Sequence, residues 1–381
     1  MVGFLAGDDL TPNRIELARQ QAAAGAGYID LTSSNPTHHG LLFPPEVLRQ
    51  AADRYWATRR YDPDPRGLRP AREAIARYYA GRTPPLALDP DDIFITASTS
   101  EAYSLLFSLL AAPGDNVLGP SVTYPLFDYL AAAHHVELRP YALDELRGWR
   151  IDPASLRLQA DDHTRAVLVV SPHNPTGMVV RSALPSLAAL GMPVICDEVF
   201  AEFPYGAPLV PPFGALYPEL PVFHLNGISK MFALPDMKLG WIALSGPARA
   251  LFSERLEVLN DTFLGASTLV QTMLPDLFAH GGAFVQEMRE RFRANLDMAL
   301  QILARSDRLR AHPPDGGYYL FPEVDGWDDE EELVLHLLAR GALVHPGYFY
   351  GYERGIRIMI SCLTEPALLR EGLERVVDAL R

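Results

Sequence analysis

The sequence predicts an α/β fold: a mostly parallel sheet wrapped by helices in a large domain, joined by a smaller α+β domain. Two observations lead to this prediction. Short β-branched runs alternate with helical stretches from Ala97 to about Val222, which is typical of parallel strands joined by helices. A long amphipathic pattern then leads into a mixed segment that ends in "GIRIMIS". The length of 381 residues suffices for both parts.

The strands expected in the sheet are short apolar runs, and helical patterns lie between them. We expect strands at "DDIFIT" (91–96), "NVLGP" (116–120), "RAVLVVSP" (165–172), "PVICDEV" (193–199) and "PVFHLNG" (221–227). The segments 100–112 and 181–191 read as intervening helices, and 283–306 reads as a long amphipathic helix. We place the large domain at 46–284 and the small domain at 1–45 and 285–381.

Composition narrows the class of function. The net charge of −14 is spread along the chain, which argues against a nucleic-acid partner. No apolar run approaches the ~20 residues that a membrane span needs, and the start of the sequence is acidic where a signal peptide is basic. Only two cysteines are present, too few for a disulfide framework. We therefore expect a cytoplasmic enzyme that acts on small molecules, with no metal site.

Both lysines of the chain, Lys230 and Lys238, lie within one segment of fifteen residues, "GISKMFALPDMKLGW", while the other 31 of the 33 basic residues are arginine. A lysine that is desolvated can lose its proton and attack a carbonyl, which arginine cannot do because its pKa is too high. The pair therefore predicts a nucleophilic amine. Two surface lysines clustered by accident are the alternative.

Polar residues follow each predicted strand, and ligands of open α/β sheets bind at these carboxyl ends. The sequence after the first strand, Ala97 to Glu101, could open a helix whose N–H groups bind phosphate, or could be a plain capping box. Tyr124 follows the second strand, where its ring could stack on a flat ligand or pack in the core. Asn174 follows the third strand, Asp197 and Glu198 end the fourth, and Lys230 follows the fifth. Together they predict a site for an aldehyde-bearing pyridine phosphate.

The order "NPTG", "DEVF" and "SK", with a second cation and "LG" eight residues later, resembles the fold type I pyridoxal-phosphate enzymes, specifically the class I and II aminotransferases. The resemblance extends from "SNPTHHG" through "YDPDPRGLRPAREAIARYY" to "GIRIMIS". It implies a seven-stranded sheet, pyridoxal 5'-phosphate as cofactor, amino-acid and 2-oxo-acid substrates, and a homodimer.

The resemblance also implies a role for each site residue. Lys230 would hold the cofactor as a Schiff base and carry the proton, Asp197 would pair with the pyridine nitrogen, and Tyr124 would stack on the ring. Asn174 would hydrogen-bond the 3' oxygen. Arg357 would clamp the substrate carboxylate, although an ordinary ion pair is the alternative, and Asn35 would close over the substrate. The phosphate would be bound by Ser98, Thr99, Ser100, Ser229, Lys238 and Tyr61, the last from a partner subunit.

Two positions depart from the commoner family pattern. Phe200 stands three residues after Asp197, where many relatives have tyrosine, and Lys238 stands where arginine is commoner. Both would touch the cofactor and alter its electronic tuning.

The sequence leaves other functions open. A β-lyase, an oxidase or a biosynthetic cyclase could use the same cofactor, because the fold does not fix the reaction. A ligand sensor built on an aminotransferase-like module is disfavoured, since about 30 residues precede "SNPT" and such regulators carry a basic segment there. A nucleotide-binding dehydrogenase is disfavoured because "GAG" (25–27) follows no strand and lacks a third glycine. No second arginine marks a dicarboxylate site, so we expect a neutral or aromatic substrate side chain.

Overall fold

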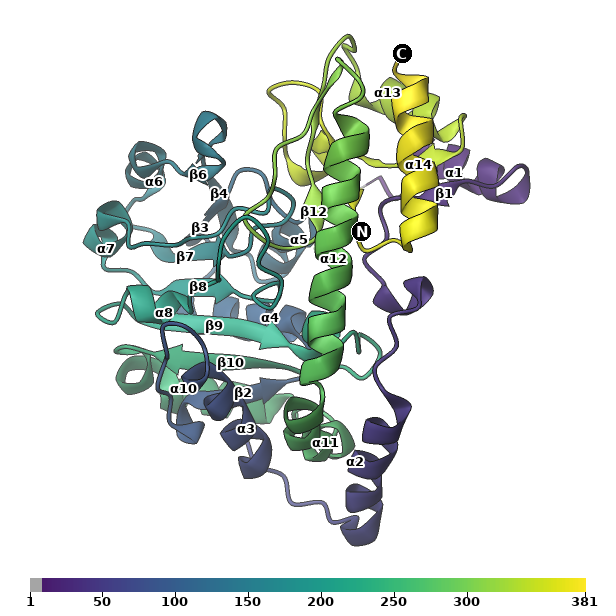
Figure 1. The fold of residues 1–381 in the computed structure, drawn as a ribbon. Coiled ribbons are helices and arrows are strands. Elements are labelled where there is room, and N and C mark those ends of the chain that lie inside the picture. Colours follow the sequence, from purple (N-terminus) through teal and green to yellow (C-terminus); the bar gives the residue numbers. More distant parts are fainter. Residues whose placement is uncertain (1–8) are drawn as a thin grey trace.

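A seven-stranded sheet forms the centre of the fold, in the order β2-β10-β9-β8-β7-β3-β4 (Figure 1). The structure is a computed structural model and describes residues 9–381. β10 runs antiparallel to both of its neighbours, and the remaining ladders are parallel. The strands are β2 (Ile93–Thr96), β3 (Asn116–Pro120), β4 (Glu137–Tyr141), β7 (Thr164–Val170), β8 (Val194–Asp197), β9 (Val222–Gly227) and β10 (Gly240–Ser245).

Helices cover both faces of this sheet, so its central strands β8 and β9 are buried at every position. One face packs against α4 (Thr99–Leu110), α5 (Leu126–Ala132) and α10 (Ala248–Thr262). The other face packs against α3 (Arg69–Ala80), α6 (Pro153–Gln159), α7 (Pro185–Leu190), α8 (Phe213–Leu216) and α11 (Thr268–His280). The predicted fold class is therefore confirmed.

All five predicted strands of the sheet are present, within a few residues of the expected bounds. The sequence analysis missed β10 and the edge strand β4. The sequence of β4, "ELRPY", carries charges and a proline, and four of its five residues are half-buried or exposed, so it lacks the apolar run of an inner strand. The predicted helix at 181–191 is shorter than expected because Pro185 begins it.

A second hydrophobic core combines the two ends of the chain. Ile15, Ile29 and Leu31 pack there with side chains between Leu296 and Leu380. This part contains α1 (Arg14–Ala24), β1 (Ile29–Asp30), α12 (Gly282–Leu303), α13 (Glu330–Leu338), α14 (Pro366–Ala379), β11 (Leu309–Arg310), β12 (Tyr319–Leu320), β13 (Glu323–Val324), β14 (Ala342–Leu343), β15 (His345–Pro346) and β16 (Ile358–Ser361).

α12 links the two parts, running in Figure 1 from the lower end of the sheet to the level of α14. Met288 and Phe292 near its start pack in the core of the sheet, whereas Leu296 to Leu303 pack in the second core. The division into domains at residues 45/46 and 284/285 stays a prediction, and residues 1–8 of the predicted small domain lie outside the described residues.

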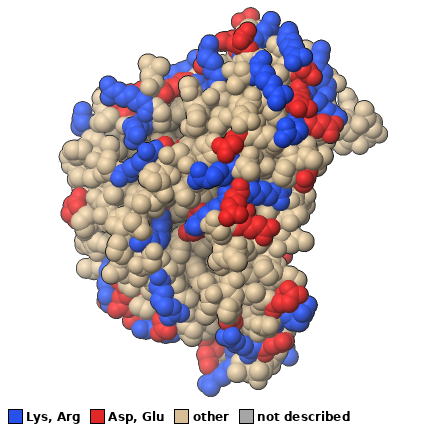
Figure 2. Space-filling view, in the orientation of Figure 1, with Lys and Arg blue, Asp and Glu red and all other residues tan. Residues whose placement is uncertain are grey.

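Short elements complete the fold between these parts. They are α2 (Pro45–Thr58), α9 (Ile228–Met231), β5 (Leu143–Asp144), β6 (Arg150–Ile151), η1 (Pro36–His39), η2 (Pro90–Asp92), η3 (Glu145–Arg147) and η4 (Gly347–Tyr350). Acidic and basic side chains are interspersed on the face drawn in Figure 2, without a continuous basic tract on that face. Within residues 9–381, no helix has the length and apolar character needed to cross a membrane.

Candidate functional site

A cavity of about 280 Å³ opens at the carboxyl ends of β7, β8 and β9, beside the start of α4. Its position follows from the topology, because parallel strands direct the residues after them to one edge of the sheet. The lining includes most of the predicted site residues: Ser98, Thr99, Ser100, Tyr124, Asn174, Asp197, Phe200, Ser229, Lys230 and Lys238.

The start of α4 forms one end of the cavity. Ser98 caps the helix by accepting a hydrogen bond of 3.1 Å from the Glu101 amide, and Glu101 accepts one of 2.5 Å from the Ala97 amide. The capping arrangement is thus present, and Ser98, Thr99 and Ser100 also line the cavity. A Cβ at Gly240 would lie 2.9 Å from the Ser98 carbonyl carbon, so only glycine allows β10 to approach this turn. The helix N-terminus, with Ser229 and Lys238 nearby, suits a phosphate.

Asp197 ends β8 with its carboxylate almost fully buried. Its Oδ2 accepts a hydrogen bond of 2.9 Å from the Tyr103 hydroxyl, and its Oδ1 accepts one of 3.0 Å from the Val199 amide. Burial raises the pKa of Asp197 to about 6, although both hydrogen bonds oppose the rise. A carboxylate held this way is ionised near neutral pH and is suited to a cationic partner in the cavity.

Lys230 lies in α9, directly after β9. Its Nζ donates a hydrogen bond of 3.2 Å to the main-chain oxygen of Ser34. Burial lowers the pKa of Lys230 to about 8, and the charge of Asp197 only partly opposes the fall. A fraction of the amine is therefore neutral at physiological pH, which is the form that attacks a carbonyl.

Asn174, Phe200 and Tyr124 line the same cavity as Asp197 and Lys230. The Oδ1 atom of Asn174 is buried without a hydrogen-bond partner among the described residues, so its amide is available to a bound group. Phe200 packs edge-to-face on the ring of Tyr319, at a centroid distance of 5.6 Å. Tyr124 is 40% exposed and contacts the ring of Phe127 edge-to-face at a centroid distance of 5.7 Å. Stacking of Tyr124 on the cofactor stays a prediction.

Asn35 does not line the cavity; its neighbour Ser34 does. The Asn35 side chain caps η1 and accepts hydrogen bonds from the Thr37 amide at 3.1 Å and from the Thr37 hydroxyl at 2.8 Å. Asparagine before "PT" is a strong N-cap, and this local role takes up the side-chain oxygen. Closure of Asn35 over a substrate stays a prediction.

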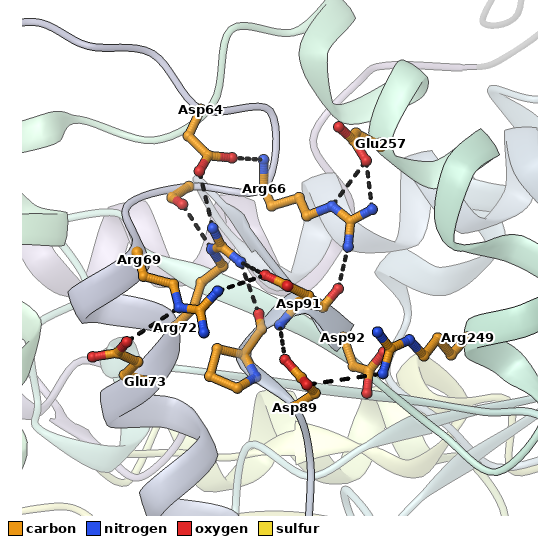
Figure 3. Close-up of polar contacts among 12 residues, drawn as sticks. Asp64, Arg66, Arg69, Arg72, Glu73, Asp89, Asp91, Asp92, Arg249 and Glu257 are labelled. Atoms are coloured by element: carbon orange, nitrogen blue, oxygen red, sulfur yellow. Dashed lines mark hydrogen bonds and ion pairs between the residues drawn. The ribbon is translucent and has the colours of Figure 1, made fainter.

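Tyr61 lies outside this cavity, on a segment fixed by a network of charges (Figure 3). The buried guanidinium of Arg72 donates to the main-chain oxygen of Gly67 at 2.8 Å, to Asp64 at 2.9 Å and to Asp91 at 2.8 Å. Tyr61 itself is 66% exposed, as a residue that serves a neighbouring subunit should be. Its role in a partner's site stays a prediction.

Arg357 is not brought to the cavity. Its guanidinium is only 3% exposed and lies over three rings, at 5.0 Å from the centroid of Trp149, 5.2 Å from Tyr352 and 5.7 Å from Phe321. It also forms an ion pair with Glu145 and donates to the main-chain oxygen of Phe321 at 2.7 Å. The ion pair that we left as the alternative is present, and Arg357 does not line the cavity. Its role as a clamp for the substrate carboxylate stays a prediction.

The sequence analysis missed three polar residues of this site, Tyr103, Ser34 and Tyr319. Tyr103 lies on α4 at a position that reads as ordinary core, yet it bonds Asp197. Ser34 and Tyr319 line the cavity from segments near the two ends of the chain. The pairing of β12 with β16, in which Tyr319 opposes Ser361, positions Tyr319. The doubled tyrosine in "GGYYLF" was the available signal.

Comparison with known proteins agrees with this geometry. The sequence pattern described as "Aminotransferase class I and II" matches residues 26–376. The chain belongs to this family. This aminotransferase is 30% identical to the S-alkyl-thiohydroximate lyase of Arabidopsis thaliana over 81% of the chain and 70% of the relative, and 28% identical to human tyrosine aminotransferase over 92% and 80%. An alanine aminotransferase from Pyrococcus furiosus shares the fold, with a TM-score of 0.88, 24% identity and coverage of 97% and 99%.

Members of the family use pyridoxal 5'-phosphate, and the cavity of this aminotransferase fits that cofactor. The helix N-terminus and Lys238 suit the phosphate, and the buried carboxylate of Asp197 suits a protonated ring nitrogen. The side-chain NH₂ group of Asn174, which lines the same cavity, would donate to the 3' oxygen, and Lys230 would supply the amine that binds the aldehyde.

Proposed function

We propose that this aminotransferase moves an amino group between an L-amino acid and a 2-oxo acid in two half-reactions that share one site. The observation that carries the proposal is the pairing of Lys230, whose pKa is lowered to about 8, with the buried carboxylate of Asp197 in one cavity. Bound pyridoxal phosphate supplies an electron sink that makes the substrate Cα–H acidic.

The chain's own residues then divide the work. Asp197 is ionised above pH 6 and accepts a hydrogen bond from Tyr103. Its negative charge would stabilise the protonated form of the ring nitrogen. Lys230 would hold the cofactor, and its amine, when free, would take the proton from the substrate Cα and return it later in the same half-reaction. In this structure Nζ of Lys230 donates a hydrogen bond to the main-chain oxygen of Ser34, which fixes its place on the cavity wall.

The cavity wall favours a neutral or aromatic substrate side chain. Tyr124, Phe127, Leu130 and Tyr319 line it, while its charged side chains are Asp197, Lys230 and Lys238 among the described residues. A relative named for tyrosine supports this preference. A dicarboxylic substrate would place a second anion against an apolar wall, which is unfavourable.

A lyase reaction is the second candidate, and the relative named as a lyase favours it specifically. Both reactions begin with loss of the Cα proton to Lys230. They differ in whether the Cβ substituent leaves before the proton returns.

We also propose a homodimer in the cytoplasm. Tyr61, Trp56 and Leu264 are 66%, 56% and 75% exposed, which is a large exposure for apolar side chains and is relieved if a second copy covers them. Two buried, free cysteines suit a reducing compartment.

A panel of amino donors, each with 2-oxoglutarate or pyruvate as acceptor, tests the proposed reaction. We expect one new amino acid for each 2-oxo acid formed from the donor, with aromatic or neutral donors preferred. Release of ammonia or of a Cβ leaving group in equal yield would replace this proposal with the lyase.

A further inference from the structure

Proton transfer at Lys230 fixes where the substrate must lie. The Cα that loses its proton has to sit within a few ångströms of Nζ, and a carboxylate bonded to that Cα cannot lie much further away. The groups that bind this carboxylate must therefore belong to the wall around Lys230. That wall is the one where Ser34 lies 3.2 Å from Nζ.

No arginine of the described chain lines the cavity. Asp197 would repel a carboxylate, and Lys230 and Lys238 are assigned to the cofactor. The remaining polar residues that line the cavity include Ser34, which contacts the Lys230 amine, and Tyr319. Tyr319 is 5% exposed and lines the cavity, and a phenol hydroxyl can donate a hydrogen bond to a carboxylate.

Arg357 is fully engaged elsewhere. It stands before β16 in the second part of the fold, whereas Glu145 and Trp149 belong to the η3 region next to the sheet. The Tyr352 hydroxyl adds a hydrogen bond of 3.3 Å to the same carboxylate of Glu145. Releasing the guanidinium would break the ion pair and expose a buried carboxylate and three rings.

We propose that the substrate carboxylate is bound without an arginine of this chain, by the Tyr319 hydroxyl and by the hydrogen-bond donors of Ser34, its hydroxyl and its amide, and that Arg357 instead joins the two parts of the fold through Glu145. This inference rests on the proposed function, because it takes the cavity as the substrate site. It also makes Tyr319 a specificity-determining residue of that site.

A matched pair of donors separates the two roles. L-phenylalanine and 2-phenylethylamine differ only in the carboxylate, so the ratio of their kcat/KM values reports how well that group is bound. Donor consumption is measured, whatever the products. Release of ammonia would thus contradict the transamination without affecting the ratio.

For Arg357→Gln and Glu145→Gln we expect kcat/KM to fall by the same factor for both donors, so that the ratio changes less than about threefold. If Arg357 instead clamped the carboxylate through charge-assisted hydrogen bonds, its loss would lower kcat/KM for phenylalanine alone, by roughly 10- to 100-fold. A change of threefold or more in Arg357→Gln would overturn the proposal. Arg310→Gln, which removes an exposed ion pair with Glu323, is the control for a lost nearby charge.

For Tyr319→Phe we expect kcat/KM for phenylalanine to fall roughly fivefold more than for the amine. Tyr352→Phe, which removes a phenol outside the cavity, should leave the ratio unchanged. An equal effect of Tyr319→Phe on both donors would remove Tyr319 from the carboxylate site.

Thermal unfolding provides a readout that does not depend on catalysis. Arg357→Gln and Glu145→Gln should each lower Tm by roughly 5 °C or more, and the double variant should be hardly less stable than either single one. Additive losses would show that the two side chains do not act as a pair. If Arg357→Gln fails to fold, Glu145→Gln alone still decides, because it frees Arg357 and would raise phenylalanine turnover relative to the amine only if Arg357 were the clamp.

Discussion

The Tyr103 hydroxyl donates a hydrogen bond of 2.9 Å to Oδ2 of Asp197, which ties α4 to the end of β8. The helix whose N-terminus would bind the cofactor phosphate therefore also holds the carboxylate that we assign to the ring nitrogen. One helix would in this way position both the phosphate and the group that tunes the ring.

Removal of this hydrogen bond should raise the pKa of Asp197 further, because the bond favours the ionised form. For Tyr103→Phe we expect cofactor affinity to fall several-fold at pH 6.5, where less of the carboxylate is then ionised, and to fall less at pH 8.5. Equilibrium dialysis at both pH values measures this. An equal loss at both would show that Tyr103 acts only through packing.

Asp197 should destabilise the protein when no cofactor is bound. Its pKa is raised from 3.8 to about 6, so the folded state disfavours the charged carboxylate above pH 3.8, and the penalty grows until about pH 6. At pH 8 a shift of this size costs about 3 kcal/mol. We expect Asp197→Asn to raise the free energy of unfolding of the cofactor-free protein by up to this amount, with the gain vanishing below pH 4. Urea unfolding at pH 4 and pH 8 checks it, and an equal effect at both pH values would contradict the assigned cause.

Capture of the cofactor by Lys230 should depend on pH. With a pKa of about 8, roughly a tenth of the amine is neutral at pH 7, so the rate should rise with pH and level off above 9. Stopped-flow absorbance with added pyridoxal phosphate measures the rate. Asp197→Asn should lower the midpoint, because it removes the anion that raises this pKa.

Lys230→Arg should show no covalent capture of the cofactor. Normal turnover in that variant would reject the assignment of Lys230.

Much of this site follows from the sequence because it lies at strand ends. Asp197, Asn174 and Lys230 come directly after apolar strands, and a parallel sheet brings such positions together whatever the loops do. The direction of a side chain in an irregular segment is harder to predict. Asn35 turns to cap η1, and Arg357 turns into an aromatic box built from segments more than 200 residues apart in the chain. The sequence could not distinguish Tyr103 from the core residues of its helix, because only its hydrogen bond to Asp197 sets it apart.

Phe200 lines the cavity beside Asn174 and lacks the hydroxyl that could donate to the cofactor's 3' oxygen. For Phe200→Tyr we expect a lower pKa of the Schiff-base nitrogen, because the added hydrogen bond favours the anionic oxygen. A spectral pH titration of the loaded enzyme gives the midpoint. If the midpoint stays or rises, residue 200 does not face this oxygen.

Lys238 lines the cavity from a left-handed backbone position, with φ of 52°, and we assign it to the cofactor phosphate. We expect Lys238→Ala to lose cofactor clearly faster than the wild type during dialysis, because the ammonium group that would pair with the phosphate is removed. Lys238→Arg keeps the charge but adds bulk, so it should retain cofactor less well than wild type. Wild-type retention in the alanine variant would place Lys238 outside the phosphate site.

A single turnover without an acceptor tests the central claim most directly. The loaded enzyme is mixed with an excess of an aromatic or neutral L-amino acid, and the products are counted per active site. We predict one 2-oxo acid per site, no free ammonia, and an amino group retained on the cofactor until a 2-oxo acid is added. Continued production of 2-oxo acid with ammonia, in the absence of any acceptor, would contradict transamination by this chain.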